Sequence, residues 1–307
     1  MIEKLEYLIA LARERHFGRA AVACGVTQPT LSSGIKQLEE MLGVLLVDRG
    51  SRFHGLTAEG ERTLDWARRI VADARAMQAD LRGVPSRLSG RLRLGVVPSA
   101  LPAVAALTTP YRAAHPGVTF SVLSRTSNEI LEMLENLQID AGMTYLDGEA
   151  TLSERTGQSE RMGRVRTLAL HQERYCLAIS AAAAGAFGAV ASWAEVGAVP
   201  LCLLTPDMQN RRIIAGRLRE AGTEGETTLE SNSMITLMSH VRTGQWASVL
   251  PVGVAEAFGL PASIRLIPIE ETGPMPTIGL VYPQRDPIAP LTAALLEIAH
   301  LVAPPHK

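Results

Sequence analysis

Hydrophobic residues near the start of the chain recur at the spacing of helices. Within residues 3–13 they fall at i, i+3, i+4 and i+7, which places one apolar stripe along an amphipathic helix. Small residues fill 18–24, and Gly25 follows them, as glycine often does after the last helical residue. The pattern predicts two short helices here. The stripe of the first consists of Leu5, Leu8, Ile9 and Ala12.

A third helix is predicted to begin at Thr27 or Gln28. Thr27 can accept a backbone N–H as the N-cap, and Pro29 suits the first turn because its missing N–H would have no partner there. The exposed beginning of this helix is polar and uncharged, which favours a helix lying against base edges in a DNA major groove over one facing only solvent. Its buried edge consists of Leu31, Ile35, Leu38 and Leu42.

A helix, a glycine-containing turn and a second helix with a polar tip are typical of a helix-turn-helix. Gly43 ends the polar-tipped helix, and a short apolar run at 45–47 leads into the turn-rich segment 48–54. Such a segment can form a small wing. Arg49 and Arg52 within it suit contacts with phosphates or the minor groove.

A long helix is predicted from Thr57, the expected N-cap, to about residue 81. Its seam positions alternate in steps of three and four, which is coiled-coil spacing. Small alanines and a polar glutamine weaken the seam, so two alternatives stay open: pairing with a second copy, or packing on its own domain. Residues 83–86 contain Gly and Pro and predict a hinge. The seam positions are Leu64, Ala67, Val71, Ala74, Gln78 and Leu81.

Alternating strand and helix patterns begin near residue 91. A βαβαβ order is typical of a largely parallel sheet covered by helices, and the later alternation predicts a second α/β subdomain. The first alternation comprises strands 91–97, 118–123 and 139–145 with helices 103–114 and 128–137. The second comprises strands 166–170, 175–180, 200–204, near 249, 264–269 and 278–282, and helices near 193 and at 209–221, 234–243 and 290–302.

Ligands of such sheets bind beyond the carboxyl ends of the strands, near helix N-termini. Three segments fit this position: 98–100, 126–129 and 205–207. Each of them can equally be a simple helix cap. All three facing one cleft would indicate a ligand site.

Composition narrows the class of protein. A chain of 307 residues predicts two or three domains at about one domain per 100–200 residues, and 47% hydrophobic with 20% charged residues predicts compact folding. No run approaches the roughly 18 apolar residues of a membrane span, and the start lacks the pattern of a signal peptide. We expect a cytoplasmic protein without membrane contact.

Candidate catalytic and metal chemistry is absent from the sequence. Three cysteines without a C-x-x-C pair favour neither a disulfide framework nor a zinc site, and seven scattered histidines show no metalloprotease spacing. We find no nucleophile elbow and no P-loop, so we expect no catalytic residues, no metal and no cofactor. The net charge of −1 does not by itself indicate nucleic-acid binding, which therefore rests on local geometry.

The N-terminal region resembles the DNA-binding domain of LysR-type transcriptional regulators. The residues that carry the resemblance are Gly18-Arg19-Ala20-Ala21, Val26-Thr27-Gln28-Pro29-Thr30-Leu31-Ser32, Ile35-Lys36-Gln37-Leu38-Glu39, Leu42-Gly43, Leu46-Val47-Asp48-Arg49 and Leu56-Thr57-Ala58-Glu59-Gly60. Ser33 and Gly34 stand where the commoner pattern has Arg and a longer polar side chain. The resemblance implies groove-facing positions at Gln28, Pro29, Thr30 and Ser33. It implies positions nearer the phosphates at Thr27, Ser32, Lys36, Arg49 and Arg52.

The second region resembles the effector domain of the same family less specifically. The matching segments are Leu92-Arg93-Leu94-Gly95-Val96, His115-Pro116-Gly117-Val118, Leu137-Gln138-Ile139-Asp140-Ala141-Gly142 and Val249-Leu250-Pro251. The resemblance implies that Ser99 and Ser127 line an effector cleft, with Ala100, Thr144, Thr205 and Ser233 as further positions. A hydroxyl-rich lining of this kind suits a small carboxylate or oxyanion.

The resemblance implies an α/β multidomain protein. We expect a winged helix-turn-helix at 1–57, a linker (dimerisation) helix and hinge at 58–86, and a periplasmic-binding-protein-like effector domain at 87–307. Within the latter, subdomain I covers about 90–164 and 270–307, and subdomain II about 165–269.

The expected function is sequence-specific DNA binding and transcriptional regulation, controlled by a small metabolite between the two subdomains. The expected partners are a palindromic double-stranded operator, a second copy of the chain in a dimer or tetramer, and RNA polymerase. An alternative is a ligand-independent regulator that responds to redox state or to a protein partner. An α/β enzyme lacks a catalytic constellation, and a solute-binding protein would not carry a helix-turn-helix.

Overall fold

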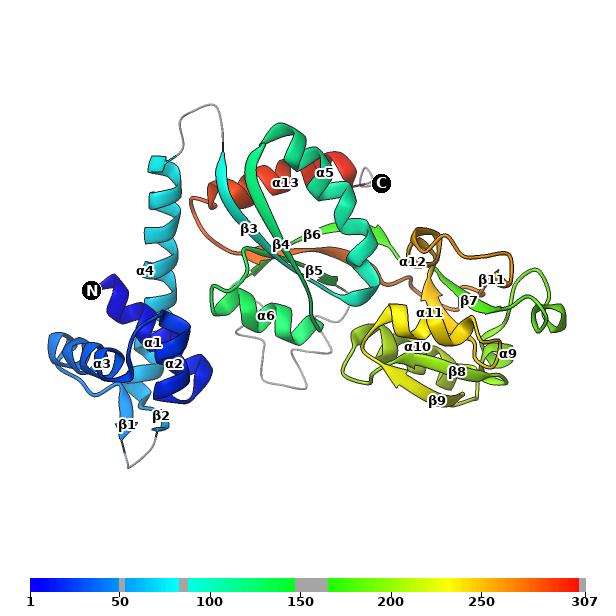
Figure 1. The fold of residues 1–307 in the computed structure, drawn as a ribbon, viewed down its shortest axis with the longest axis horizontal. Helices are drawn as coiled ribbons and strands as arrows, with labels where there is room; N and C mark the ends of the chain where they lie inside the picture. Colours follow the sequence, from blue (N-terminus) through cyan, green and yellow to red (C-terminus); the bar gives the residue numbers. More distant parts are fainter. Residues whose placement is uncertain (50–52, 83–87, 147–164, 304–307) are drawn as a thin grey trace. The chain divides into compact units, whose positions relative to one another are not determined.

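The computed structural model describes residues 1–49, 53–82, 88–146 and 165–303. The chain forms two compact units, which Figure 1 draws with their element labels. The first contains Met1–Leu88 with two short segments, Glu135–Gln138 and Pro287–Pro290. The second contains the remaining residues. The predicted hinge at 83–86 lies outside the described residues.

The first unit has the order of elements that the apolar spacing predicts. Three short helices precede a two-stranded antiparallel wing and one long helix. Apolar side chains from all three short helices form its core, with Leu8, Leu11, Leu31, Ile35 and Leu38 fully buried. The elements are α1 (Ile2–Glu14), α2 (Phe17–Cys24), α3 (Gln28–Leu42), β1 (Val47–Arg49), β2 (Phe53–Leu56) and α4 (Ala58–Arg82).

Local caps fix the ends of α2 and α3. The His16 ring accepts backbone N–H groups at the start of α2, and Gly25 ends this helix with φ of 69°, a left-handed conformation that glycine adopts without strain. Thr27 caps α3 as predicted and accepts the N–H of Thr30. The predicted N-cap Thr57 likewise accepts the N–H of Gly60 at 2.9 Å. The chain turns between α2 and α3 because Gly25 ends the first helix and Thr27 begins the second.

The long helix α4 packs on its own unit at first. Leu64, Ala67 and Val71 of the predicted seam are buried in the core of the first unit. A different stripe is exposed: Trp66 is 62% exposed and Met77 56%, with Ile70 between them. The alternative of packing on its own domain is therefore correct for the first half of the predicted seam.

A five-stranded mixed sheet organises one part of the second unit. Its order is β4-β3-β5-β12-β6, with β3, β4 and β5 parallel, as the βαβαβ pattern predicts. The later strand β12 lies antiparallel to β5 and to β6. The strands are β3 (Ser89–Val96), β4 (Gly117–Ser124), β5 (Ala141–Tyr145), β6 (Val165–Gln172) and β12 (Thr277–Pro283). Helical elements connected to them are η1 (Pro98–Val104), α5 (Ala105–Ala114), α6 (Ser127–Glu135) and α13 (Pro290–Val302).

Two smaller sheets organise the other part of this unit. The buried strand β7 lies between β10 and β11 and runs antiparallel to both, while β8 and β9 are parallel. The strands are β7 (Tyr175–Ser180), β8 (Pro200–Leu204), β9 (Glu226–Ser231), β10 (Ser248–Pro251) and β11 (Ile264–Pro268). The helices are η2 (Ala184–Ala186), α9 (Trp193–Gly197), α10 (Gln209–Glu220), α11 (Met234–Val241) and α12 (Val252–Ala257).

Two chain segments connect the large sheet with β7 and β11. One joins β6 to β7 through Glu173 and Arg174, and the other joins β11 to β12 through residues 269–276. The Glu173 N–H donates to the carbonyl of Pro276 at 2.8 Å, so the two connections lie side by side. We call this pair of segments the crossover.

Among the described residues, no helix has both the length and the apolar character needed to cross a bilayer.

Candidate functional sites: a polar helix tip and a buried polar cluster

The first turns of α3 present the predicted DNA-reading side chains to solvent. Ser32 is half-buried, and the other positions are exposed: Thr27, Gln28, Pro29, Thr30, Ser33 and Lys36. The Thr27 and Thr30 hydroxyls are hydrogen-bonded to each other at 2.8 Å, which fixes the tip of the helix. A short row of amide and hydroxyl groups on a helix end is suited to base edges and phosphates.

Gly34 is a packing position in this structure. It is buried on the inner side of α3, and a Cβ placed there would lie 2.6 Å from Cδ2 of Tyr7. The Tyr7 ring of α1 therefore needs a glycine opposite it. This explains why a longer side chain is absent at Gly34.

The wing is formed, but its two arginines are only partly described. Arg49 is the last residue of β1, and Arg52 lies outside the described residues. Their contact with DNA stays a prediction. Behind the wing, buried Glu39 accepts the N–H groups of Leu46 and Val47 at 3.0 and 3.2 Å, which ties α3 to the first strand.

Five polar side chains meet in the interior of the second unit, and we call them the buried polar cluster. They come from η1, the end of β5, the crossover, the start of β7 and the first turn of α10. All five are buried, and the exposed fraction of Glu173 is 5%. The cluster consists of Ser99, Tyr145, Glu173, Tyr175 and Asn210.

Tyr145 is the centre of the cluster. Its hydroxyl donates to Oε2 of Glu173 at 2.6 Å, lies 2.8 Å from the Ser99 hydroxyl and accepts from Nδ2 of Asn210 at 3.2 Å. A phenol has one proton and can accept two hydrogen bonds, so Ser99 donates to Tyr145 when Tyr145 donates to the carboxylate. Tyr175 also approaches Oε2 of Glu173, at 3.4 Å. The cluster thus bonds the large sheet, through Tyr145, and the sheet that contains β7, through Tyr175, to the crossover.

Burial sets the electrostatics of the cluster. It raises the pKa of Glu173 to about 7, although the hydroxyls of Tyr145 and Tyr175 act in the opposite direction by hydrogen bonding to the carboxylate. Burial also raises the pKa of both tyrosines well above the usual value, so they stay protonated donors. Among the described residues, no ion pair joins Glu173 to a lysine, arginine or histidine.

A second pair of hydroxyls lies at the N-terminus of α6. Thr144 donates to Ser127 at 2.9 Å, and both side chains are buried. The predicted capping box is present just before them, with Thr126 and Glu129 each accepting the other's N–H. Gly142 lets α6 approach the sheet, because a Cβ there would lie 2.3 Å from Cγ2 of Ile130.

The remaining predicted effector residues differ in their surroundings. Ala100 is buried beside Ser99. Thr205 follows β8, and its buried hydroxyl has no hydrogen-bond partner among the described residues. Ser233 caps α11 by accepting the N–H of Thr236, and no described hydrogen bond joins it to the cluster.

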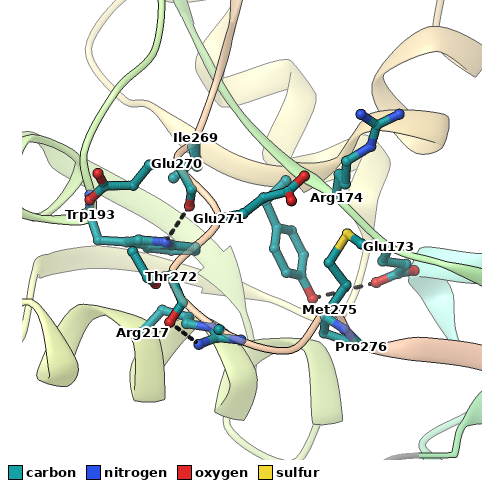
Figure 2. A pocket seen from close by; sticks show the side chains of 12 residues that line it. Glu173, Arg174, Trp193, Arg217, Ile269, Glu270, Glu271, Thr272, Met275 and Pro276 are labelled. Carbon is teal, nitrogen blue, oxygen red and sulfur yellow. Dashed lines mark hydrogen bonds between the residues drawn. The ribbon is translucent and has the colours of Figure 1, made fainter.

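A recess opens beside the cluster at the crossover, shown in Figure 2. The rings of Tyr175 and Trp193 line it edge to face, with their centroids 6.1 Å apart. Glu270 and Glu271 also line the recess. Its cavity volume is about 20 Å³, room for about one water molecule in this conformation.

Both parts of the chain match known protein families. Residues 2–61 match the bacterial regulatory helix-turn-helix proteins of the lysR family, and residues 85–303 match the LysR substrate binding domain. The chain belongs to the LysR family of transcriptional regulators.

A relative and two solved structures illustrate the similarity of this LysR-family chain. A hydrogen peroxide-inducible genes activator of Haemophilus influenzae is 26% identical over 94% of this chain and 92% of its own length. A cysteine-to-aspartate variant of full-length OxyR from Pseudomonas aeruginosa superimposes with a TM-score of 0.74 at 24% identity, over 100% of this chain and 97% of its own. CbnR in complex with its target DNA gives 0.60 at 23% identity, over 99% of this chain and 100% of its own.

The cysteines of this LysR-family protein are poorly suited to react with peroxide. Cys176 and Cys202 are buried, and burial raises their pKa values to about 12 and about 11. Desolvation also raises the pKa of half-buried Cys24. The thiolate is the reactive form of cysteine, so these environments hold the thiols in their inert form. Among the described residues, no three His, Cys, Asp or Glu side chains are grouped as metal ligands.

Sequence reasoning missed four of the five residues in the cluster. Ser99 was predicted from its place after a strand, but Tyr145, Glu173, Tyr175 and Asn210 were not. Glu173 forms a charged pair with Arg174 in the sequence between two strands and looks like an ordinary turn residue. The available signal was the tyrosine at each facing strand end in a chain with only five tyrosines.

Proposed function

We propose that a small molecule bound at the buried polar cluster controls DNA binding by this LysR-family regulator. The observation that carries the proposal is the hydrogen-bonded connection of Ser99 and Tyr145, from η1 and β5, with Tyr175 and Asn210, from β7 and α10. It runs through Glu173 and through a direct bond from Asn210 to Tyr145. A ligand that binds there replaces hydrogen bonds within the cluster by hydrogen bonds to itself.

Control requires that the ligand prefer one conformation over another. A ligand shifts the equilibrium between DNA-binding states only by the difference in its affinity for them. The bond from Asn210 to Tyr145 is present in this arrangement, and we propose that it breaks in another. A ligand bound at the cluster therefore makes different contacts in the two arrangements. A ligand bound to one sheet alone makes the same contacts in both.

For the DNA side, we propose that Gln28, Pro29, Thr30 and Ser33 face the major groove. Thr27, Ser32, Lys36, Arg49 and Arg52 are proposed for the phosphates. The exposed polar tip of α3 supports the first group. One recognition helix reads only a few base pairs, so we propose a palindromic operator bound by at least two copies. We retain 1–57, 58–86 and 87–307 as the functional division of the chain.

Self-association is proposed through the exposed stripe of α4, which carries Trp66, Ile70 and Met77. These positions repeat at steps of four and seven, so they fall along one line of the helix. Apolar side chains of this size exposed along one line are typical of a helix that pairs with another helix. This stripe replaces the predicted seam, whose first half is buried in the first unit.

The test is footprinting of the purified protein on the DNA that flanks its own coding sequence, at fixed salt. A panel of small carboxylates, oxyanions, amines and neutral polar compounds is added singly. We expect a protected palindromic region that shortens or shifts with one compound. Protection that no compound changes would contradict control by a small molecule, and absence of protection at low salt would contradict specific DNA binding.

Peroxide sensing is a second candidate function, favoured by the name of the Haemophilus influenzae relative. The buried, poorly acidic thiols speak against it here. We expect hydrogen peroxide to leave the footprint unchanged. A peroxide-dependent shift that is lost in a variant with Cys24, Cys176 and Cys202 replaced by serine would favour the redox function instead.

A further inference from the structure

Glu173 is a carboxylate enclosed by protein without a cation to neutralise it. Its neighbours within hydrogen-bonding distance are neutral hydroxyls: the phenols of Tyr145 and Tyr175, and Ser99. An ionised group taken out of water is costly unless an opposite charge and hydrogen bonds compensate it. Hydrogen bonds from these neutral hydroxyls compensate part of that cost and leave the charge unmatched.

The recess beside Glu173 has the character of a cation site. Two further carboxylate side chains, Glu270 and Glu271, line it, and Tyr175 and Trp193 provide aromatic rings. Aromatic rings attract cations through the negative potential of their faces.

The arginines that line the recess are exposed or already engaged. Arg217 donates to the carbonyls of Thr272 and Pro274 at 3.0 and 2.7 Å and pairs with Glu220 at 3.2 Å. Arg174 is exposed to solvent, and Figure 2 shows its guanidinium directed away from the carboxylate of Glu173. Neither arginine forms a described ion pair with Glu173.

An anionic ligand is disfavoured at this position. A second carboxylate next to Glu173 would create like-charge repulsion, so one of the two groups would have to take up a proton. A protonated amine instead gains an ion pair and donates hydrogen bonds to Glu173. The negative charge of Glu173 therefore favours a cationic ligand, whereas a hydroxyl-rich lining alone suggests a carboxylate or oxyanion.

We propose that Glu173 anchors an effector that carries a protonated amine, with the rings of Tyr175 and Trp193 beside it. This inference rests on the proposed function, since it names the class of ligand for the same site. The small cavity in this conformation requires the crossover to open for the amine to enter. Opening breaks the bond between Asn210 and Tyr145, which joins recognition of the amine to the arrangement of the two sheets.

The experiment uses the full-length protein and three probes with the same four-carbon chain. They are 1,4-diaminobutane, 4-aminobutanoate and succinate, which carry two amines, one of each group, and two carboxylates. Thermal denaturation is followed with each probe at equal concentration and ionic strength, and affinities are measured by calorimetry. We expect stabilisation in the order diamine, then amino acid, with none from succinate.

Three variants make the test specific to Glu173. Glu173→Gln keeps a hydrogen-bond acceptor for Tyr145 and should weaken diamine binding at least roughly tenfold, since it removes one partner of an enclosed charge pair. Glu173→Asp keeps the charge and should retain the preference for amines. Glu226→Gln, at an exposed position of β9 outside the recess, is the matched control and should bind the diamine like the parent chain.

Several results would overturn the inference. Succinate stabilising more than the diamine would show an anion site, and a diamine shift that survives Glu173→Gln would show general polycation binding. Absence of any amine effect in the parent chain would also reject it. A footprint that responds to a carboxylate in both the parent and Glu173→Gln would leave the proposed function standing while rejecting the amine anchor.

Discussion

One carboxylate determines the chemistry of the buried polar cluster. Glu173 is close to its protonation midpoint at neutral pH because burial raises its pKa to about 7. Each neighbour in the cluster is a neutral donor, so the charge of the site changes with this single group. Changes at Glu173 are therefore expected to alter ligand class and stability together.

Stability of the second unit should fall as pH rises toward neutrality. The folded pKa of Glu173, about 7, exceeds its ordinary value of 4.5, so its contribution is fully present below pH 4.5 and is lost as pH rises through 7. The groups lining the same recess, Arg174, Arg217, Glu270 and Glu271, are common to parent and variant. Relative to Glu173→Gln, the parent should lose roughly 3 kcal/mol across this window.

Thermal denaturation of both proteins at closely spaced pH values measures this difference. Parallel melting curves for the parent and Glu173→Gln from pH 4.5 to 8 would show that Glu173 does not titrate in this range.

The packing of Gly34 against Tyr7 makes a second prediction at this scale. Gly34→Ala should destabilise the first unit by about 1–3 kcal/mol, because a Cβ would meet the Tyr7 ring at 2.6 Å. Gly216→Ala is the matched control: this glycine lies within α10 with open space around its Cβ position, so alanine should stabilise by up to about 1 kcal/mol. Denaturant unfolding monitored by circular dichroism would decide, and equal effects of the two changes would contradict the packing argument.

Local rules predicted some site residues and could not predict others. Ser99 and Ser127 follow or begin elements whose type the apolar pattern reveals, so their position at strand and helix ends was predictable. Glu173 and Asn210 contact Tyr145 only because the fold brings together segments that are distant in the sequence. No spacing rule connects residues 145, 173 and 210, and that is why the carboxylate in the cluster was missed.

At the scale of elements, helix periodicity was sufficient for the DNA-reading part and insufficient for α4. The caps at Thr27 and Thr57 follow directly from the sequence, as does the buried edge of α3 up to Leu38. The prediction was wrong for Leu42, which is 45% exposed in the last turn of the helix. The helix α4 has apolar residues on more than one side, and the sequence alone does not show which side meets the core. Strand direction in the second unit also depends on distant pairing, which explains the unpredicted antiparallel β12.

Substitutions on α3 should distinguish side chains that read bases from side chains that bind phosphates. Gln28→Ala is expected to reduce discrimination between operator variants by about 1–3 kcal/mol, because an exposed amide near base edges reads sequence. Lys36→Ala is expected to weaken binding to all sequences alike and to lower the salt slope by about 1. Fluorescence anisotropy across a salt series measures both. Identical profiles for the two variants would contradict the assigned positions on α3.

The exposed stripe of α4 should hold copies of the chain together. Trp66→Lys and Met77→Lys are expected to shift the protein toward the monomer, since each places a charge in an apolar contact. Glu61→Lys introduces the same residue at an exposed position off the stripe and should leave the oligomeric state unchanged. Analytical ultracentrifugation would show the difference. Unchanged assembly in both stripe variants would place the contact elsewhere.

At the scale of the whole molecule, the proposed control by a ligand needs a device that makes two arrangements of the second unit differ in energy. The buried polar cluster is proposed as this device because its bonds join two sheets at the crossover. A bond present in one arrangement and absent in the other is worth about 1 kcal/mol, enough to change populations severalfold. Ligand binding and DNA binding are expected to influence each other reciprocally.

The most direct test needs no knowledge of the effector. Asn210→Leu keeps the branched shape and the number of heavy atoms of the side chain and removes the hydrogen bonds to Tyr145 and Tyr175, so it should favour the opened arrangement without ligand. Footprinting of this variant on its operator should show a protected region whose length or phasing differs from that of the parent. The matched change at exposed Asn232 should leave the footprint as in the parent. An Asn210→Leu footprint identical to that of the parent, with full response to the parent's effector, would contradict control through the buried polar cluster.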